Sequence, residues 1–260
     1  MVAHVQYEYA ALLAQCDYYL GQILDYMDKK NMWGDTMLIV NTDHGFLLGE
    51  HDWWAKCRMP FYNEIAHTPL FVWDPRFGNA GVRRKSLTQM IDLPATLLEF
   101  FGIPKPKDMV GMSLKQVICD DQPVRDFALF GIFGGHINIT DGQYVYMRAA
   151  KDGTANRPLF HYTQMPTHID RFFSTNEMAT MSWHPGFTFT KGTPVMKIDA
   201  SLEEWWWEDF ETMLFDLHND PEQKIPISDG IIEAKMVSAL IDAMRRNDAP
   251  TDQYERLGLV

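Results

Sequence analysis

Hydrophobic residues near the start of the chain recur with helical spacing and then gather into short runs. Between residues 7 and 28 they return every three or four positions, which predicts an amphipathic helix. The apolar positions of this helix are Leu12, Leu13, Cys16, Leu20, Ile23, Leu24 and Met27. Continuous apolar runs at 37–40 and 69–73 predict two buried strands, the first of which extends to residue 42. Asp92 is predicted to cap a further helix that ends at Gly102.

The pattern changes after about residue 125. Short apolar stretches at 127–130 and 144–147 predict strands joined by glycine-rich turns. Residues 151–210 are rich in aromatic residues, histidine and proline, and we expect them to be irregular. A short strand is predicted at 214–217.

Two structural parts follow from this order of elements. The first part, residues 1–125, runs helix, strand, loop, strand and helix, which predicts an α/β layer. The second part, residues 126–260, is expected to be a smaller α+β subdomain that contains the irregular segment 151–210. It ends in a helix near 230–246, where apolar residues return every four positions.

Composition supports a packed core and excludes two classes of partner. Of the 260 residues, 46% are hydrophobic and 13% aromatic, which is ample for a folded interior. The net charge of −12 argues against nucleic acid, because binding phosphate backbones needs clustered cations. No apolar run approaches the roughly 20 residues of a membrane span, so no membrane is expected. The three cysteines form no disulfide framework.

The densest candidate chemistry directly follows the first predicted strand. Asp43 and His44 lie side by side at its carboxyl end, which is the edge where open α/β sheets bind ligands. A carboxylate beside an imidazole suits a divalent metal. Lys56 follows 13 residues after Asp43, and an ammonium group suits an anionic oxyester. The pattern therefore favours a metal-assisted site built for a charged group.

Four segments together resemble the carboxyl-terminal half of a sulfatase, a branch of the alkaline-phosphatase-like superfamily. They are residues 17–24, residues 42–56 with 62–64, residues 90–104, and residues 214–222. In order and spacing they cover nearly the whole chain. The resemblance implies a partial alkaline-phosphatase-like sheet with flanking helices, followed by the smaller α+β subdomain.

The resemblance also implies roles for individual residues. Asp43 and His44 would be metal ligands, with Asp43 ionised and His44 neutral, and Lys56 would contact the anionic oxygens of the ester. Calcium is the metal that the family implies. Manganese and zinc stay open, because an imidazole ligand is softer than calcium prefers.

The family's nucleophile has no counterpart in this sequence. Sulfatases carry C-x-P-x-R, whose cysteine, or in some members serine, becomes formylglycine. None of Cys16, Cys57 and Cys119 begins that pattern, and neither does any serine. We therefore expect a fragment that lacks the amino-terminal formylglycine segment and is inactive by itself. Such a fragment is expected to expose a surface that favours self-association.

The leading hypothesis is a sulfuric ester hydrolase that acts on a small sulfate ester. A phosphonate monoester or phosphodiester hydrolase of the same superfamily is one alternative, and a non-catalytic truncated domain is another. The amino terminus shows no basic region followed by an apolar stretch, which favours a cytoplasmic protein. In a fragment that feature carries no information, so the localisation is left unassigned.

Several other residues have competing interpretations. For His51 two interpretations are equally supported: a partner that orients a metal ligand, or a solvated loop residue. Cys57 is expected to be a partly buried thiol. His4 lies too close in sequence to Asp43 to act as the family's catalytic histidine. Trp205–Trp207 are expected to pack rather than to bind substrate. Three histidines of the irregular segment are expected at ordinary loop positions rather than at a pocket mouth: His161, His168 and His184.

Overall fold

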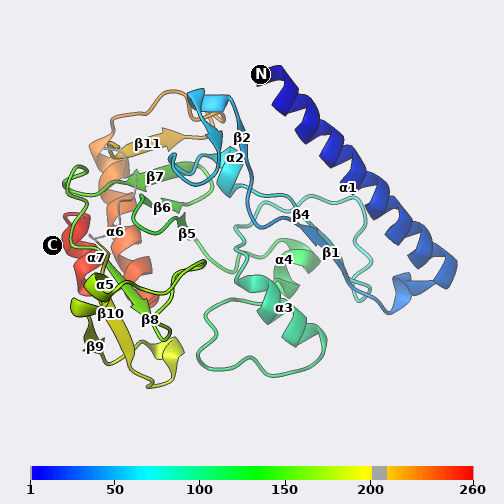
Figure 1. The fold of residues 1–260 in the computed structure, drawn as a ribbon. Coiled ribbons are helices and arrows are strands. Elements are labelled where there is room, and N and C mark those ends of the chain that lie inside the picture. Colours follow the sequence, from blue (N-terminus) through cyan, green and yellow to red (C-terminus); the bar gives the residue numbers. More distant parts are fainter. Residues whose placement is uncertain (1, 201–209, 260) are drawn as a thin grey trace.

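The computed structural model describes residues 2–200 and 210–259 (Figure 1). The first part contains α1 (Val2–Lys30), η1 (Met32–Gly34), β1 (Leu38–Asn41), β2 (Leu47–Leu48), η2 (Glu50–Asp52), β3 (Trp54–Ala55), α2 (Asn63–Ala66), β4 (Leu70–Trp73), α3 (Asp92–Phe100) and α4 (Lys115–Asp120). The second part contains β5 (Ala128–Gly131), β6 (Ile137–Thr140), β7 (Tyr144–Arg148), β8 (Phe160–Thr163), α5 (Thr175–Ala179), β9 (Ser182–His184), η3 (Thr188–Thr190), β10 (Val195–Asp199), β11 (Met213–Asp216), α6 (Gly230–Arg246) and α7 (Thr251–Arg256).

Helix α1 is longer and far more exposed than its sequence pattern predicts. It has 29 residues, and Met27 is the residue of its described length that is buried. Leu12 and Leu13 are 60% and 62% exposed, so the apolar stripe of the predicted amphipathic helix is largely exposed. Figure 1 shows why: α1 runs along one side of the molecule. Self-association through such a face stays a prediction. Among the described residues, no helix is long and apolar enough to cross a membrane.

Strands β1 and β4 confirm the two predicted strands but not their burial. They pair antiparallel as a two-stranded sheet, with Ile39 opposite Val72. Every residue of both strands is half-buried or exposed, and Phe71 is 68% exposed. In a ribbon of two strands both faces need cover from other elements, and the described elements cover them only in part.

Asp92 has a wider role than the predicted helix cap. Ile91 takes the N-cap position, and Asp92 is the first residue of α3 with its side chain fully buried. The carboxylate accepts hydrogen bonds from the backbone N–H of Gln89 at 2.7 Å and of Met112 at 2.8 Å. It also forms an ion pair with Arg125. The residue therefore fastens three separate segments together instead of one helix end.

The four-stranded sheet is the centre of the second part, with antiparallel strands in the order β11-β7-β6-β5. One of its faces is covered by α6, the helix that was predicted near 230–246. Ile139, Tyr146 and Leu214 from the sheet pack there with Met236 and Leu240. Asp229 caps this helix by accepting hydrogen bonds from the two N–H groups of Ile231 and Ile232.

The opposite face of the same sheet packs against the first part of the chain. Val145, Met147 and Phe215 form one buried cluster with Leu47, Met59, Tyr62 and Ile65. The side chains of a strand alternate between its two faces, so neighbouring residues of β7 belong to different clusters. The sheet is therefore buried on both sides and joins residues that lie 80 to 168 positions apart in the sequence.

The prediction that residues 151–210 are irregular is wrong for the part that the structure describes. A three-stranded antiparallel sheet runs β8-β10-β9, and α5 lies beside it. The strands have only three to five residues, which is too short for a clear sequence period. Strand β6 and helix α7 are two further elements that the sequence pattern missed. Trp205–Trp207 lie outside the described residues.

Candidate active site

The turn that follows β1 carries the predicted metal ligands. The Asp43 carboxylate accepts a hydrogen bond from the backbone N–H of His44 at 3.0 Å and one from the Thr42 hydroxyl at 3.3 Å. Desolvation of the Asp43 carboxyl acts to raise its pKa. These hydrogen bonds and the His44 ring outweigh that effect and hold the pKa of Asp43 below its ordinary value. Asp43 is therefore an ionised, exposed carboxylate at neutral pH.

The ring of His44 has a defined orientation. Its Nδ1 lies 2.9 Å from the carbonyl oxygen of Gly45. A carbonyl only accepts hydrogen bonds, so Nδ1 carries the hydrogen and the neutral ring keeps a lone pair on Nε2. That Nε2 lies 3.0 Å from Oδ2 of Asp43. The two atoms that a metal would use therefore lie next to each other.

Lys56 is brought to the same place by a short hairpin. Strands β2 and β3 pair antiparallel and return the chain toward the Asp43 turn. The Lys56 ammonium contacts Nε2 of His44. Ala55, immediately before it, has a φ of 78°, and His51 at the hairpin tip has a φ of 55°. Such backbone strain in non-glycine residues is typical of functional sites. The structure thus brings together all three residues predicted for the site.

The donor set fits a divalent cation held from one side. One carboxylate oxygen and one imidazole nitrogen lie 3.0 Å apart, and both atom types suit such an ion. Across residues 2–200 and 210–259, no group of three or more His, Cys, Asp or Glu side chains could hold a metal. Asp43 and His44 would therefore need further ligands that are not His, Cys, Asp or Glu side chains of the described residues.

The structure also shows the surroundings of His51, Cys57 and His4. The His51 ring is stacked on Tyr62 with centroids 3.6 Å apart, and its side chain is 9% exposed, so the solvated interpretation is wrong. Its Nε2 lies 3.5 Å from a Glu64 carboxylate oxygen. The Cys57 thiol is exposed rather than partly buried. His4 pairs with Glu8 on the surface of α1.

Gly45 lets the turn that carries Asp43 and His44 approach helix α2 closely. Its N–H donates to the carbonyl oxygen of Ile65 at 2.8 Å. A Cβ atom at this position would lie 1.6 Å from the carbonyl oxygen of Glu64, well inside van der Waals contact. Only glycine allows this contact. The turn is therefore packed directly on the backbone of α2.

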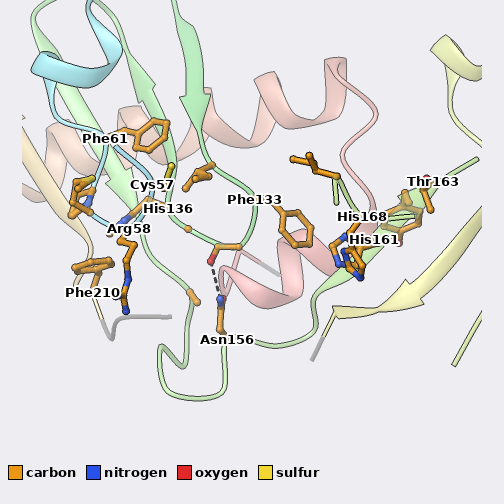
Figure 2. A pocket seen from close by; sticks show the side chains of 18 of the residues that line it. Cys57, Arg58, Phe61, Phe133, His136, Asn156, His161, Thr163, His168 and Phe210 are labelled. Carbon is orange, nitrogen blue, oxygen red and sulfur yellow. Dashed lines mark hydrogen bonds between the residues drawn. The ribbon is translucent and has the colours of Figure 1, made fainter. Parts of the chain in front are cut away.

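A pocket of about 1150 Å³ begins at the residue after Lys56 (Figure 2). Cys57, Arg58 and Phe61 line it from the first part of the chain. The second part contributes the turn before β6, strand β8 of the three-stranded sheet and the loop before α5. His161 and His168 also line the pocket, against expectation, whereas His184 is not among its lining residues.

A buried acid behind the far wall of the pocket holds one of these histidines. Nε2 of His168 lies 2.6 Å from Oε1 of Glu177. Glu177 also forms a capping box with Ser174 at the start of α5. Burial acts to raise the pKa of Glu177, but the hydrogen bonds from Ser174 and His168 outweigh it and lower the pKa to about 2. The wall is therefore fixed by an ionised carboxylate.

The sequence is similar to that of known enzymes over part of its length. The family model described as Sulfatase matches residues 4–103. N-acetylglucosamine-6-O-sulfatase of Bacteroides thetaiotaomicron is 33% identical over 111 residues, which are 43% of this chain and 20% of that protein. Arylsulfatase K of Rattus norvegicus is 29% identical over 182 residues, which are 65% of this chain and 32% of that protein. The chain therefore spans between a fifth and a third of these two relatives.

A solved structure shares the fold over most of the chain. It is described as a complex with its substrate D-glucosamine-2-N,6-O-disulfate, and it matches with a TM-score of 0.62. The match covers 91% of this chain and 39% of that one, at 19% sequence identity. At this identity the likeness concerns the fold, and it confirms the predicted α/β class.

Replacing Gly45 by alanine is expected to destabilise the protein by roughly 1–3 kcal/mol, because the new methyl group overlaps backbone that cannot move aside freely. Gly21→Ala is the matched control, since a Cβ at Gly21 meets nothing within 4 Å. In the exposed helix α1 this control should stabilise by up to ~1 kcal/mol. Urea unfolding measures both changes, and equal effects of the two substitutions would contradict the packing argument.

Glu177→Gln is expected to flatten the acid dependence of stability. A carboxyl whose folded pKa is depressed to about 2 stabilises the fold above its unfolded pKa, and this contribution is lost as the pH falls through the folded value. The advantage of wild type over the variant should therefore shrink by about 1–3 kcal/mol between pH 5 and pH 2. Unfolding curves at several pH values test this, and parallel profiles for the two proteins would refute it.

Proposed function

We propose that this chain, whose residues 4–103 match the Sulfatase family model, forms the metal-binding and anion-binding side of a site that hydrolyses a small sulfate ester. The family expected from the sequence motifs is thereby confirmed. The placement of the chain as the carboxyl-terminal half stays a prediction. One observation carries the proposal: Nε2 of His44 lies 3.0 Å from the Asp43 carboxylate and is contacted by the Lys56 ammonium.

Asp43 and His44 would hold the cation. The His44 ring is fixed by its Nδ1–H bond to the Gly45 carbonyl, which leaves the Nε2 lone pair for a metal once the Lys56 ammonium moves off that atom. Asp43 is ionised and exposed, and it can turn an oxygen toward the same ion. When bound, a divalent metal polarises the oxygens of an ester. Calcium, manganese and zinc remain the candidates, because the site mixes a hard oxygen with a softer nitrogen.

Lys56 would neutralise the ester's negative charge. Its ammonium group lies at the imidazole of His44, so an anionic group held by the metal would lie within its reach. A fixed positive charge at the place where negative charge develops is among the largest contributions to catalysis in such sites. The nucleophile is not assigned to this chain, since none of its cysteines or serines stands in a C-x-P-x-R or S-x-P-x-R pattern. Sulfatases generally use formylglycine in that role.

Metal binding can be tested directly on the 260-residue chain by titration with Mn²⁺. We expect weak binding, with a Kd on the order of 10⁻⁴–10⁻³ M, that broadens the NMR signals of residues 42–45 and of Lys56. His44→Gln and Asp43→Asn should each weaken binding at least about tenfold, whereas Asp25→Asn on exposed α1 should not change it. Broadening that persists unchanged in both site variants, or tight stoichiometric binding, would contradict the proposed ligands.

The role of Lys56 is tested by ester hydrolysis in the enzyme as its source organism makes it. Lys56→Ala is expected to lower kcat/KM for p-nitrophenyl sulfate by roughly 10²–10³. Lys29→Ala, at the end of exposed α1, is the matched control and should leave it unchanged. A strong preference of the wild type for a phosphonate monoester would instead establish the alternative hydrolase. Turnover by the 260-residue chain alone would disprove its predicted inactivity.

A further inference from the structure

Asn138 is a buried polar residue on an otherwise apolar sheet face. Along β6, Ile137 and Ile139 point toward α6, because Ile139 belongs to the cluster that packs on that helix. Side chains of a strand alternate, so Asn138 points to the other face. There it lies in register with Met147 of β7, a member of the opposite cluster. The Asn138 amide therefore lies on an apolar face of the sheet, beside the buried Met147 of β7.

The Asn138 amide has no hydrogen-bond partner among the described residues. Asn138 is 1% exposed, and neither its Nδ2 nor its Oδ1 has a hydrogen-bond partner among the described residues. His136, two positions earlier on the same side, is satisfied: its ring Nε2 lies 2.9 Å from the carbonyl oxygen of Glu211. Burial lowers the pKa of His136, so this ring is neutral and donates to that carbonyl. An unpaired buried amide destabilises the fold, so Asn138 is costly to keep for folding alone.

Asn138 lines the large pocket beside the proposed active site. Figure 2 shows His136, Phe210 and Arg58 gathered at one end of this pocket, His161 and His168 at the other, and Phe133 between them. The end that contains His136 is also the end that contains Cys57, the residue after Lys56. Aromatic side chains at positions 61, 133 and 210 supply flat apolar walls there.

We propose that this pocket binds the organic part of the sulfate ester, and that the Asn138 amide is its specificity-determining contact. The inference rests on the proposed function, because it places the sulfate at Lys56 and the remainder of the substrate in the adjoining space. The walls fit a ring with apolar faces. The amide, which both donates and accepts, fits a hydroxyl or amide substituent on that ring. A sugar and a substituted phenol share this chemistry.

This arrangement predicts strong discrimination by one substituent. A ring that carries the hydrogen-bonding group pairs the Asn138 amide on binding, whereas a bare ring leaves it buried and unpaired. Sites of this kind reject the analogue that lacks the group much more strongly than an apolar pocket rejects a missing methylene. Asn138, and not the aromatic wall, would therefore select among sulfate esters of similar size.

Binding of unsulfated probes tests the proposal without requiring hydrolysis or metal. N-acetylglucosamine and p-nitrophenol are titrated separately into the 260-residue chain, and backbone amide shifts are followed at Phe61, Phe133 and Phe210. We expect at least one probe to shift these signals. Asn138→Leu should weaken that binding about fivefold or more. Asn219→Leu, the same change at an exposed turn outside the pocket, should leave it unaltered.

A second measurement separates recognition from a structural role. If the amide serves a ligand, Asn138→Leu should keep or raise the thermal midpoint of the probe-free protein, because an unpaired polar group is removed from the interior. Asn138→Ala is measured alongside it to account for the size of leucine. Binding of the sugar alone identifies a sugar sulfate as substrate, and binding of the phenol alone identifies an aryl sulfate.

Three results would overturn the assignment. They are failure of both probes to shift the pocket signals, binding that is equal in wild type and in both Asn138 variants, and a lowered thermal midpoint in both variants. The proposed function fails separately: a chain that binds a probe through Asn138, in an enzyme that hydrolyses no sulfate ester, would retain the pocket assignment and lose the reaction.

Discussion

Burial of the second face of the four-stranded sheet holds the candidate site in place. Phe215, Val145 and Met147 present this face to Leu47, in the first strand of the hairpin that precedes Lys56, and to Met59, three residues after Lys56. The burial of such apolar side chains is worth about 1.5–3 kcal/mol each, far more than any polar contact of the exposed turn. The Asp43 turn and the Lys56 hairpin are therefore positioned mainly by a hydrophobic contact with a distant part of the chain, and only locally by their own hydrogen bonds.

The features that the sequence could predict are those with local causes. Helix α6 follows its period of four and is capped by Asp229, and both signals lie within the helix itself. The grouping of Asp43, His44 and Lys56 was also predictable, since a strand end and a short hairpin are enough to bring them together. In each case the sequence separation is small, so few alternative arrangements compete.

The features that the sequence could not predict depend on distant partners. Asp92 has the composition of a helix cap, yet its carboxylate binds Arg125 and the backbone of Met112, which no local pattern records. The stripe of α1 has the spacing of a buried face, but burial depends on what lies opposite, and much of this face is exposed. Asn138 gives only a faint signal in the sequence, as a polar residue between two isoleucines. Its neighbour across the sheet is Met147, and no local pattern shows that pairing.

The tie between the hairpin and the sheet also bears on the order in which the protein folds. The N–H of Asn63, at the start of α2, donates to the side chain of Gln223, 160 positions away. Contacts of such long sequence separation form slowly, because the intervening chain must be closed into a loop first. During synthesis, the turn that carries Asp43 leaves the ribosome well before β11 exists to support it. The candidate site is therefore encoded early and assembled late, and its apolar neighbours stay unburied until the last strand arrives.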